Sequence, residues 1–131
     1  MNWTRAIVGG ILAELLLVVL LVPVLAVIGF DSLSDPSNVP PIVLAVVIGG
    51  SFITTLLLMQ WVAKRVSSRF VIHGAIVGLA AFAVYIIPVI AGGGEQPPAY
   101  WLAHAMKLLG GMSGGVVAAK RHASRQTAAP V

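Results

Sequence analysis

Four long apolar runs constrain this chain more than any other feature of its sequence. They cover roughly residues 5–30, 41–63, 70–91 and 99–119. Each run has about 20 to 25 residues, enough for a helix to cross a hydrocarbon core of ~30 Å at a rise of about 1.5 Å per residue. The runs predict an all-α fold, a single four-transmembrane-helix bundle over residues 1–121, followed by a polar cytoplasmic tail at 122–131.

The composition excludes a soluble globule of this size. Of the 131 residues, 59% are hydrophobic and only 9% are charged, whereas soluble domains carry about a quarter charged residues. The chain has no cysteine, so disulfides, cysteine-ligated metals and thiol catalysis are excluded. A signal peptide is a poor interpretation of the first run, because that run is too long and carries an acid at its centre.

The charged residues fall on two sides of the predicted bundle. The formal net charge is +4, and the basic residues at one set of helix ends are Arg5, Lys64, Arg65, Arg69, Lys120, Arg121 and Arg125. Asp31, Asp35 and Glu95 lie in the opposite loops. The positive-inside rule then predicts a multi-pass protein of a bacterial-type inner or plasma membrane, with both termini in the cytoplasm. Because the basic residues follow the topology, we expect the lipid bilayer as a partner and no nucleic acid.

Two charges, Glu14 and Lys107, break this sorting because they lie inside apolar runs. Counted from the basic boundary, Glu14 lies about 13 Å and Lys107 about 19 Å into the membrane. Each shares a helix face with glycines, so both are expected to point into the bundle. An unpaired charge at this depth costs at least about 2.5–3.5 kcal/mol on insertion scales. We therefore predict an ion pair between the first and fourth helices, extended toward the outside by His104, one turn from Lys107.

The predicted pair has two interpretations. In the first it only fixes the register of two helices. In the second Glu14 is a proton or cation site, since ionisable groups inside membranes often serve function. Neither involves catalysis, because no candidate nucleophile has a base beside it. His73 and His104 lie near opposite faces of the membrane, so we expect no shared metal or haem, and no cofactor.

Glycines recur at intervals of four residues in the apolar runs. Such spacing leaves a flat stripe on which another helix approaches closely, and close packing holds membrane helices together. The predicted packing positions are Gly10, Gly50, Gly74, Gly78, Gly110, Gly111, Gly114 and Gly115. In one interpretation they hold a four-helix bundle, or a dimer of bundles, together. In the other they line a permeation path or a hinge.

The two halves of the chain are similar in pattern. The segments "RAIVGGILAELLLVVLLVP" from Arg5 and "RFVIHGAIVGLAAFAVYIIP" from Arg69 both begin with Arg, place a Gly five residues on and end with Pro. Two tandem helical hairpins, related by a pseudo-twofold axis along the membrane normal, would explain the similarity. Chance is the alternative, because apolar sequences match easily.

Two family resemblances rest on particular motifs. The segment "GGILAELL" is similar to the first helix of small multidrug resistance transporters, which implies an antiparallel homodimer in which Glu14 binds drug cations and protons. The signature of that family in its third helix, around Trp and Gly, is absent here. The segments "HGAIVGL" and "LLGGMSGGVVAAKR" resemble uncharacterised small four-helix bacterial membrane proteins, and this resemblance implies no activity.

The sequence thus predicts a membrane protein that is not an enzyme. The leading hypothesis is a packing or accessory component that self-associates as a homo-oligomer or binds a larger membrane partner. The alternative is a small proton-linked transporter or channel-like oligomer that uses Glu14. A water-filled cavity reaching Glu14 would favour transport, whereas a dry and paired Glu14 would favour the accessory role.

Overall fold

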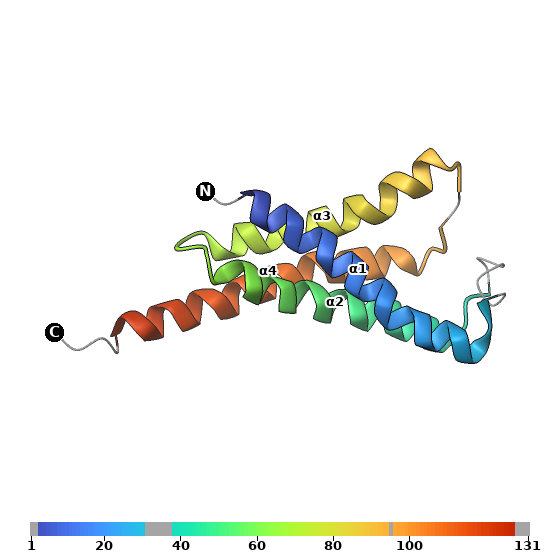
Figure 1. The fold of residues 1–131 in the computed structure, drawn as a ribbon, viewed down its shortest axis with the longest axis horizontal. Helices are drawn as coiled ribbons and strands as arrows, with labels where there is room; N and C mark the ends of the chain where they lie inside the picture. The colour runs from blue at the N-terminus through green and yellow to red at the C-terminus, as the bar shows by residue number, and fades with distance from the viewer. Residues whose placement is uncertain (1–2, 31–37, 95, 128–131) are drawn as a thin grey trace.

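The computed structural model describes residues 3–30, 38–94 and 96–127, which form four helices and no strand (Figure 1). The helices are α1 (Trp3–Ile28), α2 (Pro41–Ala63), α3 (Phe70–Ala91) and α4 (Tyr100–Thr127). The predicted all-α fold is confirmed. α1, α2 and α3 are long and apolar enough to cross a membrane, and α4 falls short by the same measure of apolarity.

Local sequence explains where the helices begin and end. A proline occupies the first position of α2, where its missing N–H breaks no intrahelical hydrogen bond. α1 ends before Gly29, whose φ of 91° lies in the left-handed region that glycine adopts after helices.

The fourth helix is longer than predicted. It continues past residue 119 to Thr127, so most of the predicted polar tail is helical, and residues 128–131 lie outside the described residues. Basic side chains in the last turns interact favourably with the negative end of the helix dipole. The hydroxyl groups of Ser124 and Thr127 also donate to carbonyls about one turn earlier in the helix, at 3.1 and 3.0 Å.

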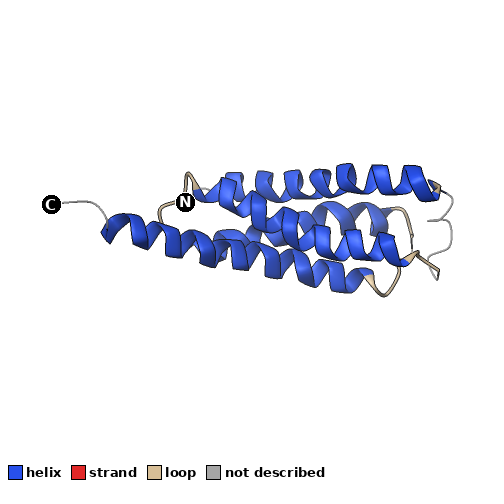
Figure 2. Cartoon of the chain, turned by 90° about the horizontal axis from the view of Figure 1, so that it is seen from below, coloured by secondary structure: helices blue, strands red, loops and turns tan. Residues whose placement is uncertain are grey.

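The helices form an up-and-down bundle in which α1 and α4 both pack against α2 and α3. α1 and α4 are therefore diagonally opposite, and no Cα atoms of these two helices come within 8 Å of each other. The start of α1 and the end of α4 lie at the same end of the bundle as the α2–α3 connection, as Figures 1 and 2 show.

The two helical hairpins pack side by side rather than around a twofold axis. A twofold axis along the bundle would place α1 and α3 at opposite corners, but α1 packs against α3, and α1 and α4 take opposite corners instead. The corresponding glycines also make different contacts, because Gly10 lies against α3 and Gly74 against α4. The arrangement thus differs from the predicted pseudo-twofold axis, because the two hairpins lie side by side and are not related by a rotation about the bundle axis.

The glycines of α4 form two stripes that face two different helices. Gly110 and Gly114 lie against the backbone of α2, whereas Gly111 and Gly115 lie against the backbone of α3. A methyl group on Gly111 would overlap the carbonyl oxygen of Gly74. The two stripes therefore let the backbone of α4 touch both neighbours.

The other predicted glycines make close approaches of the same kind. Gly78 lies against the α4 backbone at Lys107, Gly10 against the α3 backbone at Val77, and Gly50 against a side chain of α1. All eight predicted positions are therefore occupied by contacts within this chain. A protein partner would have to meet a different surface.

The outward surface of the bundle is apolar on all four helices. Examples are Leu15, Ile53, Leu79 and Leu109, each slightly more than half exposed. Polar groups lie inside instead, where the buried hydroxyl of Thr55 donates to the carbonyl of Ser51 at 2.7 Å. An apolar exterior of this extent fits lipid and not water.

We expect Gly111→Ala to lower the free energy of unfolding by roughly 1–3 kcal/mol, the usual cost of overpacking, because the added methyl group meets the backbone of α3. Gly49→Ala is the matched control, since no described atom beyond its own stretch of helix lies within 4 Å of the position its methyl group would take. Thermal or denaturant unfolding in detergent, followed by circular dichroism, measures both variants. Equal stability of the two would contradict the close contact between α3 and α4.

Candidate functional site

The candidate site is an ion pair at the centre of the bundle. Lys107 Nζ lies 2.7 Å from Glu14 Oε2. The side chain of Lys107 is 2% exposed and that of Glu14 is 9% exposed. The structure thus brings together the two charges that residue counting places near the middle of the membrane. Their contact joins α1 and α4, the two helices at opposite corners.

Glycines position both charges. Gly10, one turn before Glu14, lets α1 approach the backbone of α3. On α4, the carbonyl oxygen of Lys107 lies against Gly78 of α3. Both backbones are therefore held close to the same helix. This shared support lets two long side chains meet across the bundle although α1 and α4 do not touch.

Tyr85 on α3 completes the surroundings of the ammonium group. Lys107 Nζ lies 5.0 Å from the centroid of the Tyr85 ring, within the range of cation–π attraction. Sequence analysis missed this residue. The sequence spacing could have indicated it, because Tyr85 follows Gly74 by eleven residues and Gly78 by seven. These spacings place all three residues on one helix face.

His104 lies beside the pair and belongs to an aromatic cluster. Its Nε2 lies 3.0 Å from Oε1 of Gln96, and its ring packs against Phe82 and Tyr85 at centroid distances of 4.8 and 5.0 Å. No hydrogen bond joins His104 to Lys107 in the described part of the chain. His104 therefore does not extend the ion pair through a hydrogen bond, and its polar contact is with Gln96, which sequence analysis did not single out.

A cavity of about 270 Å³ reaches the ion pair. Glu14, Lys107, His104, Tyr85 and Tyr100 supply its polar groups, and apolar side chains of α1, α2 and α4 supply most of its wall. This mixture and size are close to the lower end of small-molecule pockets, which measure about 300–1,000 Å³. The Nδ1 of His104 is buried and has no hydrogen-bond partner among the described residues.

The cavity is partly open, and it opens on the apolar outer surface of the bundle. Val18 of α1 belongs to its wall and is 52% exposed on the apolar outer surface. A molecule could therefore enter from the membrane without crossing the bundle. An acyl chain or another apolar group fits such an entrance better than a hydrated ion does.

His73 is placed by packing contacts at the other end of the bundle. Its ring stacks on Trp3 with a centroid distance of 5.2 Å, and its Nδ1 lies 3.0 Å from the carbonyl oxygen of Arg69. Within residues 3–30, 38–94 and 96–127, no three side chains of the metal-binding kinds come together. The described residues thus offer no cluster of side chains suited to a metal ion, and His73 lies apart from the ion pair.

Comparisons with known protein families, with curated proteins and with solved structures found no match to this chain. The two family resemblances of the sequence remain hypotheses.

We expect Glu14→Gln and Lys107→Met each to lower the free energy of unfolding by roughly 3–5 kcal/mol, because each leaves a buried group without its partner. The double variant should lose clearly less than the sum of the two. A coupling energy of about 1 kcal/mol or more, measured by unfolding in detergent, would establish the pair. Additive effects would contradict it.

Lys120→Met provides the control for this cycle. Lys120 lies on the same helix as Lys107 but is exposed at the end of the bundle. Its substitution removes the same charge without touching Glu14. We expect its effect to add to that of Glu14→Gln.

Proposed function

We propose that this chain is a four-span integral membrane protein of bacterial-type inner or plasma membranes, with both termini in the cytoplasm, acting as a non-enzymatic accessory component. The observation that carries the proposal is the buried contact of Glu14 with Lys107 at 2.7 Å. Two charges that neutralise each other in this way stabilise one helix arrangement and present no free charge to a substrate. A second copy or a larger membrane protein would bind the apolar outer faces, since the glycine stripes are already occupied.

The distribution of side chains on α4 supports a fourth span despite its lower apolarity. Its first 20 residues cover about 30 Å, the thickness of the hydrocarbon core. Lys107 and His104 lower its apolarity, but both are buried in the bundle. Its exposed large side chains over the same stretch are Trp101, Leu102, Leu109, Met112, Val116 and Val117. α4 therefore presents an apolar surface to lipid.

Single cysteines report the topology directly, because the chain has none of its own. We expect Ser67→Cys and Ser124→Cys to react with a membrane-impermeant maleimide only from the cytoplasmic side, and Gly94→Cys only from the outside. All three positions are exposed. Ala81→Cys is the buried control and should react only after unfolding. Reaction of Ser124→Cys from the outside would mean that α4 does not cross the membrane.

Proton-linked transport is the second candidate function, and the cavity favours it. The cavity reaches both charges, as a path to a coupling carboxylate would. In such a mechanism a proton or a cationic substrate would displace Lys107 from Glu14 during each cycle. The accessory role has the stronger support, because Lys107 already occupies the carboxylate and the nearby wall is mainly apolar.

Proton flux into liposomes that contain a pH-sensitive dye separates the two candidates. The accessory role predicts that vesicles with the wild-type protein, with Glu14→Gln and with no protein acidify at the same rate. Gly49→Ala, which leaves the ion pair unchanged, is the control for effects of purification and reconstitution, and its vesicles should acidify as the wild-type vesicles do. A wild-type flux well above that of empty vesicles, and lost in Glu14→Gln, would overturn the accessory role and establish transport.

A further inference from the structure

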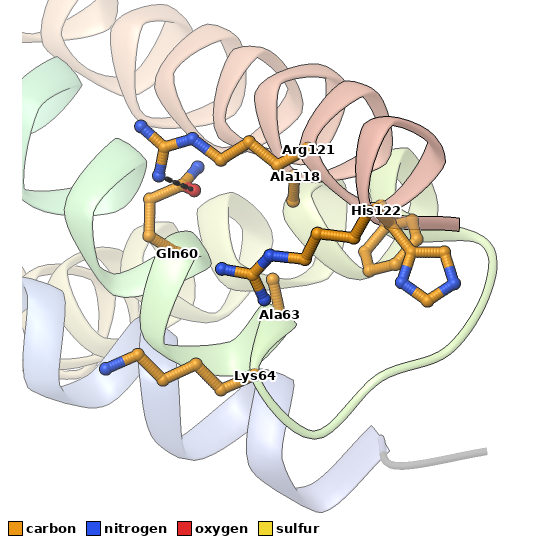
Figure 3. Close-up of a pocket in the computed structure, with 8 residues that line it drawn as sticks. Gln60, Ala63, Lys64, Ala118, Arg121 and His122 are labelled. Atoms are coloured by element: carbon orange, nitrogen blue, oxygen red, sulfur yellow. Dashed lines mark hydrogen bonds between the residues drawn. The ribbon is translucent and has the colours of Figure 1, made fainter. Parts of the chain in front are cut away.

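We propose that the inner end of the bundle holds a binding site for the phosphate group of an anionic membrane lipid. A cavity of about 140 Å³ lies there between α2, α3 and α4. Figure 3 shows Arg121 on α4 and Lys64 directly after the end of α2 among its lining residues. Its cationic lining residues are Lys64, Arg121 and Arg125, its other polar lining residues are Gln60 and His122, and its apolar lining residues are Ala63, Phe70 and Ala118. The inference rests on the proposed membrane residence and is independent of the role of Glu14.

The three cationic side chains that line this cavity have no acidic partner in the described part of the chain. The chain has four acidic residues, of which only Glu14 lies among the described residues, and Glu14 pairs with Lys107 at the bundle centre. In the described part of the chain, no carboxylate forms an ion pair with Lys64, Arg121 or Arg125. Like charges gathered around one cavity repel each other, and a bound anion relieves that repulsion.

One of these cations is held in place by Gln60 of α2. The Nε2 of Gln60 donates to the carbonyl oxygen of Gly114 at 2.8 Å. Its Oε1 accepts a hydrogen bond from Nη1 of Arg121 at 3.2 Å, the dashed line in Figure 3. The guanidinium is thus oriented before any ligand arrives. It keeps further N–H groups that can donate to phosphate oxygens, for which arginine geometry is well suited.

The level of the cavity along the bundle points to a lipid phosphate rather than a free anion. Trp61 follows Gln60 in the chain, and the guanidinium of Arg5 lies 4.0 Å from the centroid of its ring. Tryptophan and arginine are typical of the membrane–water interface. Basic pockets between helices at the cytoplasmic interface bind anionic headgroups. The apolar part of the lining would then contact the glycerol and the first methylene groups of the lipid.

Native mass spectrometry of the full chain in neutral detergent tests the site. The probes are dioleoyl phosphatidylglycerol and the matching phosphatidylcholine. We expect the wild type to prefer phosphatidylglycerol, and Arg121→Gln/Arg125→Gln to weaken its binding roughly tenfold or more. The matched control, Arg65→Gln/Lys120→Gln, removes the same charge at the same interface outside the cavity. It should retain most of the binding.

A charge-preserving variant separates binding from folding. Arg121→Lys/Arg125→Lys keeps both charges but not the guanidinium geometry, so it should fold as the wild type does and keep part of the preference. A partial loss of that preference at an unchanged unfolding temperature supports an oriented phosphate site over a diffuse charge, because the number of charges stays the same.

Three results would overturn the proposal. The first is equal loss of binding in the two Gln double variants, which would indicate general surface attraction. The second is equal binding of the two lipids by the wild type. The third is displacement of phosphatidylglycerol by millimolar inorganic phosphate, which would assign the cavity to a free anion. Failure of the four-span proposal would appear in the cysteine labelling instead, so the two failures are distinguishable.

Discussion

The close approach of α4 to α2 and α3 is the constraint on which the rest of the structure depends. Membrane helices gain little by hiding apolar surface from one another, so short contact distances and polar pairing must hold them together. The two glycine stripes of α4 remove side chains from both of its contacts. As a consequence, α4 lies deep enough for Lys107 to be surrounded by protein rather than by lipid.

The buried ammonium group then constrains the opposite corner of the bundle. A charge at this depth must be paired or neutralised, and Glu14 is the acidic residue placed to do so. Their contact crosses the diagonal and couples two helices that have no backbone contact. A well-packed apolar pair could give similar stability. We therefore interpret the pair as a device for specificity, which favours one rotation and one depth for α1 and α4 among many arrangements of apolar helices.

The positions of the helices were largely predictable, because hydropathy and span length depend only on the order of residues in the chain. α2 and α3 begin and end at the predicted residues, 41–63 and 70–91. The meeting of Glu14 with Lys107 was also within reach, since depth and helix face follow from residue counting. The order of the helices around the bundle could not be predicted from the sequence, because an apolar helix face can contact lipid or protein equally well. Tyr85 was missed for that reason, since its role appears only when the neighbours of α3 are known.

The charge asymmetry of the chain connects the membrane topology to the inner cavity. By the positive-inside rule, the number of basic residues at one end of the helices sets the orientation of the helices. This effect does not depend on which of the basic residues lie close together. Anion binding depends on that closeness, because oxygens of one phosphate must reach several donors at once. Here three of the basic residues that the positive-inside rule counts line one cavity, and Gln60 holds one of them. In the proposed topology, a chain with 9% charged residues needs no additional cations for the proposed site, because the residues that set the orientation already supply them.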